Sequence, residues 1–404
     1  MWFKFAATNV LRNRRRGLAT LLIVSVGTAG ILISGGFALY TYDSLREMAA
    51  RDNGHLILAH TDYFEKHEEI PLEYGLINFE NTRKTLMQNE LVRAVLPRLA
   101  FSGLISNGDK SSVFIGNGID VNEFKVKGPS LRVSKGATLS SRPQKNSDPQ
   151  IMIGEGLAKI MNAKPGDSLT LLSTTVEGSL NAQDVVVQGI FSIGVPEIDK
   201  RLLFTKTSTA QTLLLTNKIS TLSVYLYDTD ETNNIASIIK EIYPKLAIQH
   251  WLDTAFYYQA VRSLYNRIFG LLGIIILGMV FFAVTSNVSM SVFERTRETG
   301  TLRALGTYSS EIVRNFVIEA LILGVMSIIV GMLIAGSVAL FFSLAGLEMP
   351  APPGRSQTYP LVIYADPLLY LITGAAILIL CVTAAWLAGR RAVNKTIVEA
   401  LGHV

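Results

Sequence analysis

The chain has 404 residues, a formal net charge of +5 and 49% hydrophobic residues, but only 17% charged residues. This balance is too apolar for an ordinary soluble protein and too mixed for a chain that lies wholly inside a membrane. Most of the clustered basic residues flank apolar segments, so the positive charge does not indicate nucleic-acid binding, and we expect no nucleic-acid partner.

Residues 1–16 mix aromatic and aliphatic side chains with arginines, in WFKFAATNVLRNRRR. This mixture predicts a helix lying in the cytoplasmic membrane interface, where its basic residues suit anionic lipid headgroups. The alternative is that the segment is only the cytoplasmic end of the first membrane span.

Four long apolar runs, each about 20 residues or longer and only one of them with a charged residue, predict four membrane-spanning helices. The runs cover residues 18–40, 268–288, 316–344 and 368–388, and we place the spans at 17–41, 266–289, 314–345 and 367–389. The first run is longer than a secretory signal core of roughly 7–15 residues, which favours an uncleaved span.

Lysine and arginine gather before the first span, between the second and third, and after the fourth, whereas the loop at 346–366 holds only Arg355. The positive-inside rule therefore predicts cytoplasmic N- and C-termini, with residues 290–313 and the tail 390–404 also cytoplasmic. Residues 42–265 and the loop 346–366 are then outside.

Residues 42–265 predict an α+β domain. Strand-like runs (NGHLILAHT, STLSVYLYD, LAIQHW), the hairpin VRAVLPRLAFSGLISNGDKSSVFIGNGID and two helical runs indicate the β-α-β-β-α-β order of a split βαβ unit. This first lobe takes about 50–122 and 216–252, and a second lobe is inserted at about 123–215. The single cysteine, Cys381, lies in the fourth span, so the domain needs no disulfide.

Sequence motifs for catalysis or nucleotide binding are absent: the chain has no GxxxxGK[ST], GxSxG or HExxH. His55, His60 and His67 lie near acidic residues in HLILAHTDYFEKHEE, but their spacing favours a solvated loop over a zinc site. We expect no catalytic, cofactor or metal site in this chain.

The third span carries small residues at every fourth position, Ser327, Gly331 and Ala335. Such residues let helices approach closely, either within the chain or at a subunit interface. Glu319, near the cytoplasmic start, is the one ionisable residue of the apolar run 316–344, and no charge lies at the centre of a span. A proton or ion relay is therefore not expected.

The segment FERTRETGTLRALGT, residues 293–307, is charged although it separates two apolar spans. Its spacing predicts a helix in which Glu294 pairs with Arg297 and Arg295 with Glu298. The remaining residues of the segment are available for an apolar contact: Phe293, Gly300, Leu302, Ala304 and Leu305. A plain connector is the alternative, but a regular helix is suited to pass a push from a cytoplasmic partner to both spans.

The same segment matches the motif E-R-x-x-E-aliphatic-G-x-L-x-A-L-G at Glu294, Arg295, Glu298, Gly300, Leu302, Ala304, Leu305 and Gly306, with Thr299 at the aliphatic position. With its layout of one span, a large domain and three spans, the chain resembles the FtsX-like permeases of ABC transporters, which include the macrolide exporter (MacB) and the lipoprotein-releasing (LolC/LolE) subunits. IEALILG (318–324), TIVEAL (396–401) and IGEGLAKIMNAKPGDSLTLL are also similar to segments of that family.

The resemblance implies that the charged segment is a coupling helix that docks into a separate cytoplasmic ATPase. The implied ATPase-coupling residues are Phe293, Glu294, Arg295, Arg297, Glu298, Gly300, Leu302, Arg303, Ala304, Leu305 and Gly306. It also implies a dimer, with itself or with a sister permease, and two ATPase copies that bind the ATP and Mg²⁺. The chain is then no enzyme, holds no cofactor, and lies in the bacterial inner membrane with its large domain in the periplasm.

For the function, the resemblance implies that ATP-driven motion is transmitted through the membrane to the outer domain. Export or extraction of a hydrophobic cargo, a lipoprotein or a lipid, is the leading hypothesis, with a periplasmic lipoprotein carrier as a further partner. The alternatives are efflux of small toxic molecules or peptides with a membrane-fusion protein, and mechanical regulation of a cell-wall hydrolase without transport.

Overall fold

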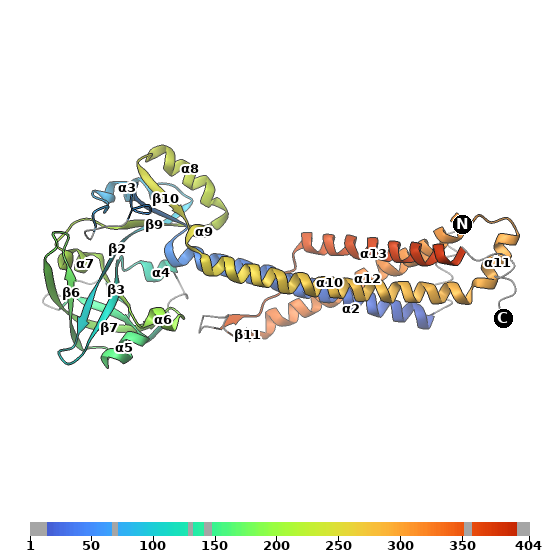
Figure 1. The fold of residues 1–404 in the computed structure, drawn as a ribbon, viewed down its shortest axis with the longest axis horizontal. Helices are drawn as coiled ribbons and strands as arrows, with labels where there is room; N and C mark the ends of the chain where they lie inside the picture. Colours follow the sequence, from blue (N-terminus) through green and yellow to red (C-terminus); the bar gives the residue numbers. More distant parts are fainter. Residues whose placement is uncertain (1–13, 67–71, 128–131, 141–147, 351–357, 394–404) are drawn as a thin grey trace. The chain divides into compact units, whose positions relative to one another are not determined.

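The computed structural model describes residues 14–66, 72–127, 132–140, 148–350 and 358–393 (Figure 1). The chain divides into a helical unit (residues 1–43, 260–349 and 360–404) and a sheet unit (residues 44–259 and 350–359). The predicted interfacial helix falls almost wholly on residues 1–13, and the TIVEAL tail on 394–404, so both lie outside the described residues.

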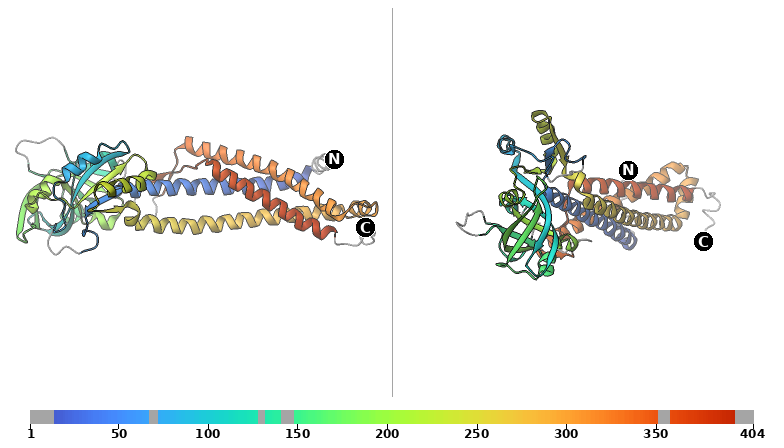
Figure 2. Two further views of the ribbon diagram at one scale, coloured as in Figure 1. Left: turned by 90° about the horizontal axis from the view of Figure 1, so that it is seen from above. Right: turned by 60° about the vertical axis from the view of Figure 1, so that its left-hand side comes forward.

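The helical unit is built from the long helices α2 (Arg14–Asn53), α10 (Phe256–Glu294), α12 (Ser309–Ala345) and α13 (Pro367–Val393), with the short α11 (Thr296–Ala304) between α10 and α12. Within the described residues, four helices are long and apolar enough to cross a membrane, and they contain the four predicted apolar runs. Figure 2 shows these helices running side by side. The predicted fold class, four spans plus an α+β domain, is confirmed.

Small residues on α12 permit its close contact with α2. The Ser25 hydroxyl donates to the Ser327 carbonyl at 3.0 Å. A Cβ on Gly331 would lie 2.8 Å from the Ser25 carbonyl oxygen, which no real side chain tolerates, and Ala335 packs against Leu32. The structure thus places Ser327, Gly331 and Ala335 in a contact within one chain.

The sheet unit holds one ten-stranded sheet in the order β10-β1-β9-β2-β3-β8-β5-β7-β4, with β6 bonded to both β2 and β7. The strands are β1 (Leu56–His60), β2 (Val92–Ser106), β3 (Ser111–Ile119), β4 (Arg132–Gly136), β5 (Gln150–Gly154), β6 (Ser168–Thr174), β7 (Leu180–Ser192), β8 (Leu202–Lys206), β9 (Thr221–Leu226) and β10 (Leu246–His250). Two short strands, β11 (Glu348–Met349) and β12 (Tyr359–Pro360), lie between α12 and α13.

The helices of the sheet unit are short. They are α3 (Phe79–Leu86), α4 (Glu123–Lys127), α5 (Glu155–Met161), α6 (Pro196–Asp199), α7 (Thr207–Leu214), the 3₁₀ turn η2 (Thr229–Glu231), α8 (Thr232–Ile242) and α9 (Trp251–Thr254). α8 buries Ile235 and Ile239 against the strands, as its alternation of apolar and polar residues predicts.

Strands β10, β1, β9 and β2 form an antiparallel group in the arrangement predicted for the split βαβ unit. Its core contains Leu56, Leu58, Val95, Val224 and Ile235. Strand β2, which follows α3, is longer than this group requires. Its residues 92–98 pair with β9, and its residues 98–106 pair with β3.

The second half of β2 opens a closed ring of six strands, β2-β3-β8-β5-β7-β6, which returns to β2 through the pairing of β6 with residues 104–106. The predicted second lobe starts at about residue 123, whereas the structure adds β3 and part of β2 to this ring. Gly103 permits the closure, because a Cβ there would lie 2.0 Å from the Leu172 carbonyl oxygen. Phe101, Phe114, Ile153 and Leu171 fill the interior.

Candidate functional site: the α10–α11–α12 segment

The segment predicted to be a coupling helix forms α11, separated from α10 by Arg295 alone. Arg295 leaves the helical conformation, with φ −95° and ψ 13°, so the helix direction breaks there. The charged sequence therefore folds as a short independent helix between two helices of membrane-spanning length, as its spacing indicates (Figure 1).

One face of α11 is buried and the other is exposed. Thr296, Thr299 and Gly300, at i, i+3 and i+4, are buried. Thr299 stands where the motif has an aliphatic residue, and its small side chain occupies this buried face. Glu294, Arg297, Glu298 and Ala304 are exposed, and Arg303 is half-buried.

Large apolar side chains are exposed on α11 and at its two ends. Phe293 is 55% exposed, Leu302 37% and Leu305 79%. An aliphatic side chain exposed to this degree beside charged residues is typical of a protein–protein contact surface. We refer to Phe293, Glu294, Arg297, Glu298, Leu302 and Leu305 as the α11 surface.

Gly306 ends α11 in a way that needs glycine. Its φ is +95°, and its amide donates to the Arg303 carbonyl while the Thr307 amide donates to that of Leu302. This pair of bonds is a Schellman motif, in which the positive-φ position suits a residue without a Cβ. The final glycine of the sequence motif thus sets the turn from α11 into α12.

Arg295 faces inward rather than toward the α11 surface. Its Nη1 atom donates to both carboxylate oxygens of Glu319 on α12, at 3.0 and 3.3 Å, and the two side chains are only 16% and 12% exposed. Sequence spacing suggests Glu298 as the partner, but the structure supplies Glu319, 24 residues away. The pair braces the start of α11 against α12.

A small, mostly apolar cavity adjoins this ion pair. It is lined by residues of α2, α10, α12 and α13, among them Thr20, Asn287 and Ser291, and about 60 Å³ is open to a water-sized molecule. The Asn287 amide donates to the Thr20 hydroxyl. The space has room for a few water molecules at roughly 10–15 Å³ each, so it does not match a cargo-sized site.

The histidine-rich segment does not form a metal site within the described residues, where no three His, Cys, Asp or Glu side chains come together. His67, Glu68 and Glu69 lie outside them. The prediction of a solvated loop is wrong for His55, which is 2% exposed at the start of β1. His60, at the end of the same strand, has a side chain that is 46% exposed.

Four membrane-length helices and an α+β sheet unit define a multi-pass membrane protein with a large extramembrane domain. Two family profiles match nearly the whole of this arrangement: the MacB-like periplasmic core domain over residues 18–242, and the FtsX-like permease C-terminal region over residues 269–397. The chain belongs to the family of FtsX-like permeases with a MacB-like periplasmic core domain, and it is a multi-pass protein of the bacterial inner membrane.

Individual relatives are distant. The chain is 23% identical to the lipoprotein-releasing system transmembrane protein LolE of Haemophilus influenzae over 65% of this chain and 64% of that protein. It is 24% identical to the corresponding LolC of Xylella fastidiosa strain Temecula1 over 64% of this chain and 63% of that protein. These matches span just under two thirds of either relative.

One further LolC and one solved structure extend the comparison. The LolC of Xylella fastidiosa strain 9a5c is 23% identical over 83% of this chain and 80% of that protein. The crystal structure of the periplasmic region of MacB from Actinobacillus actinomycetemcomitans covers 51% of this chain and 91% of its own, at 18% identity and a TM-score of 0.37.

Proposed function

We propose that the chain is the permease subunit of an ABC transporter that couples a separate cytoplasmic ATPase to its outer domain by transmitted motion. The observation that supports this most is the α11 surface: Leu302 on the short helix, Phe293 at the end of α10 and Leu305 at the C-cap of α11 are exposed beside charged residues, and the helix is joined to two membrane-length helices. Arg295 and Gly306 hold the two ends of α11, so a push on it is passed to α12 and α10.

The α11 surface is then in the cytoplasm. Arg297, Arg303 and Arg314 lie in and just after α11 along the chain, and Arg390 and Arg391 occupy the last turn of α13. These positions fit the positive-inside rule with the sheet unit in the periplasm. The ATPase supplies ATP and Mg²⁺ binding, and two ATPase copies serve a dimer of this chain with itself or with a sister permease.

The cargo class we favour is lipoprotein or lipid. Both LolE and LolC, the named relatives, are lipoprotein-releasing transmembrane proteins. The cavity inside the helical unit has water-sized dimensions, which suits a mechanism in which cargo is taken up by the outer domain rather than carried between the helices of one chain.

Reversing two charges tests the docking role. Glu294→Arg combined with Arg297→Glu inverts the exposed charges of the α11 surface without touching Arg295. We expect loss of the copurifying ATPase, at least about tenfold, because inverted charges across an interface cost several kcal/mol. Glu197→Lys with Lys200→Glu inverts an exposed i,i+3 pair on α6 and is the matched control.

The measurement is a mild-detergent pull-down from the native cells followed by native mass spectrometry. Two ATPases per two permeases with a bound acylated protein or lipid would support the full proposal. Copurification of a membrane-fusion protein instead would move the function to efflux, and a cell-wall hydrolase would indicate mechanical regulation. Absence of any ATPase from the wild-type sample would contradict the proposal.

A further inference from the structure

The end of α2 is pressed against strand β9 of the sheet unit. α2 stops at Asn53, and Gly54 follows with φ +97°. A Cβ on Gly54 would lie 3.1 Å from the Ser223 Cβ and 3.2 Å from the Val224 carbonyl oxygen. Such close approach requires glycine, and it delivers the next residue, His55, into the interior of the unit.

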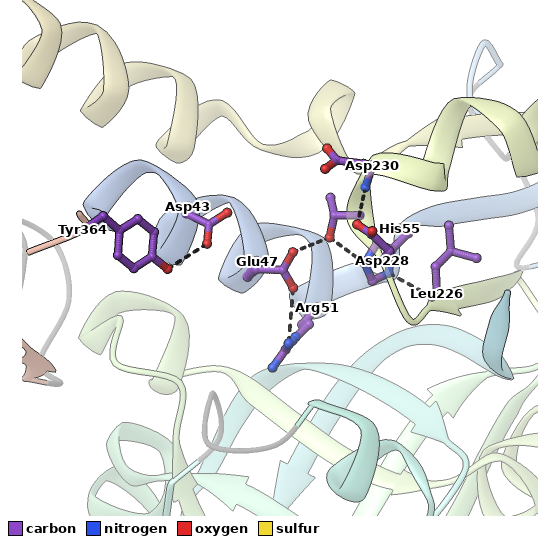
Figure 3. Close-up of polar contacts among 9 residues, drawn as sticks. Asp43, Glu47, Arg51, His55, Leu226, Asp228, Asp230 and Tyr364 are labelled. Atoms are coloured by element: carbon purple, nitrogen blue, oxygen red, sulfur yellow. Dashed lines mark hydrogen bonds and ion pairs between the residues drawn. The ribbon is translucent and has the colours of Figure 1, made fainter. Parts of the chain in front are cut away.

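His55 uses every hydrogen-bonding group it has. Its amide donates to the Val224 carbonyl at 2.8 Å, and its carbonyl accepts from the Trp251 amide at 3.1 Å. The ring accepts at Nδ1 from the Leu226 amide at 3.2 Å, and Nε2 lies 3.0 Å from the Thr229 hydroxyl (Figure 3). One residue therefore joins the end of α2 to β9, η2 and α9.

The bonds around the ring have a defined direction. Because Nδ1 accepts from an amide, the neutral ring carries its proton on Nε2 and donates it to Thr229. The Thr229 hydroxyl in turn donates to Glu47 of α2 at 2.5 Å, and Arg51 donates to the other Glu47 oxygen at 3.2 Å. This relay runs from β9 through His55 back to the last turns of α2 (Figure 3).

The end of α2 and the start of α9 meet at this residue, and α9 leads on to α10. α2 is a single helix from Arg14, so its membrane-length part and the turns that carry Glu47 and Arg51 are continuous. Trp251, bonded to the His55 carbonyl, begins α9, and α10 begins at Phe256. Displacement of α2 or of α9 thus acts on β9 through bonds made by His55.

We propose that His55 is a positioning residue that fastens α2 and α9 to β9, so that displacement of α2 moves strands β10, β1, β9 and β2 as one piece. The inference rests on the proposed function, in which motion reaches the outer domain, and names the point at which the domain receives it. Every side-chain contact that carries it lies within the sheet unit.

Protonation gives this fastening a signature. Burial is the main cause that lowers the pKa of His55 to about 4; Arg51 and Arg46 of α2 lower it further, and Glu47 of α2 and Asp228 beside η2 oppose the shift. A protonated ring carries N–H groups on both nitrogens, so Nδ1 no longer accepts from Leu226. The bond is present above this pKa and lost as the pH falls through it.

Hydrogen exchange of the full chain in phospholipid nanodiscs tests the fastening. Protection of the peptide that covers residues 222–231 is compared in the wild type, His55→Gln and Thr229→Val, with His60→Gln as the matched control on the same strand. We expect about tenfold lower protection in His55→Gln and Thr229→Val, equivalent to the loss of one hydrogen bond. Protection in His60→Gln should equal that of the wild type. The wild type should lose this protection near pH 4, and His55→Gln should show no such step.

The positioning role is read from the number of fluorescent triacylated lipoprotein molecules released per ATP in proteoliposomes that contain the copurified ATPase. We expect a several-fold lower ratio in Thr229→Val and His55→Gln, with ATP turnover retained, and a normal ratio in His60→Gln. Thr229→Val keeps the histidine, so it remains informative if His55→Gln does not fold.

Two results would overturn the inference. The first is unchanged protection in both His55→Gln and Thr229→Val. The second is lower protection with an unchanged amount of lipoprotein released per ATP, which would show that His55 has only a local structural role. A wild type without ATP-driven release would contradict the proposed function itself. The exchange comparison needs no ATP, so it separates the failure of the fastening from the failure of transport.

Discussion

A single largely buried arginine links four elements of the sheet unit. The Arg98 Nη2 atom donates to Glu123 at 2.7 Å, to the Tyr225 hydroxyl at 2.8 Å and to the Asp52 carbonyl at 2.9 Å. Glu123 and Tyr225 are each 1% exposed, and burial raises the pKa of Tyr225 above its usual range. The guanidinium therefore joins β2, β9, α4 and the end of α2, and removing it leaves a buried carboxylate.

Arg98→Met is expected to destabilise the sheet unit by about 3–5 kcal/mol, because the buried Glu123 carboxylate would lose its ion pair with Arg98. Arg98→Met combined with Glu123→Leu should recover most of this loss. Urea unfolding in nanodiscs, followed by Trp251 fluorescence with Trp2 and Trp386 replaced by Phe, measures both. Equal destabilisation in the single and double variants would show that packing, not charge, dominates.

His55 makes the stability of the sheet unit depend on pH. Its pKa is about 4 in the folded protein, against an ordinary 6.5, so between these values the unfolded chain binds more protons. The stabilisation is complete above pH 6.5 and is lost progressively as the pH falls toward 4, by on the order of 3 kcal/mol. The same unfolding measurement at pH 7 and pH 4.5 should show a smaller difference in His55→Gln than in the wild type.

At the scale of elements, α11 owes its orientation to its two ends. The Arg295–Glu319 pair ties its start to α12, and the Schellman turn at Gly306 sets its exit. Neither end belongs to the exposed face, so two residues that the family motif groups with the docking surface, Arg295 and Gly306, act in the structure by positioning the helix.

Gly306→Ala should reduce coupling more than it reduces stability. The substitution places a Cβ at φ +95°, at a cost of about 1 kcal/mol, although open space surrounds the position. Gly346→Ala, at φ +59° after α12 and equally open, is the control with the same type of strain. ATPase activity stimulated by the permease should fall in the first variant only; equal effects would remove the special role of the α11 turn.

For the whole molecule, the proposed orientation puts the α11 surface and the sheet unit on opposite sides of the membrane. Leu305 and Leu180 are both 79% exposed, which makes Leu305→Cys and Leu180→Cys a matched pair. In intact cells, an impermeant maleimide added from outside should label only Leu180→Cys, since the native Cys381 is buried. Labelling of Leu305→Cys before lysis would invert the orientation.

Hydrophobic patterning alone located the four long helices, because a run of about 20 apolar residues has no other economical environment than lipid. The charged segment at 293–307 was likewise recognisable as a helix, since its spacing is local, and the split βαβ order followed from alternating patterns along the chain. The closing of the six-stranded ring could not be predicted in this way, because the contact of Gly103 with Leu172 joins strands far apart in sequence.

The sequence by itself thus determined how much of the chain faces lipid, which segments are helices or strands, and the family to which it belongs, all of which depend on composition, periodicity and short motifs. Only the tertiary structure decided that Arg295 pairs with Glu319, that Arg98 holds Glu123, and that His55 joins α2 to β9 and α9. A buried polar group must find its partner in three dimensions, and nothing in local spacing specifies which distant residue that partner is.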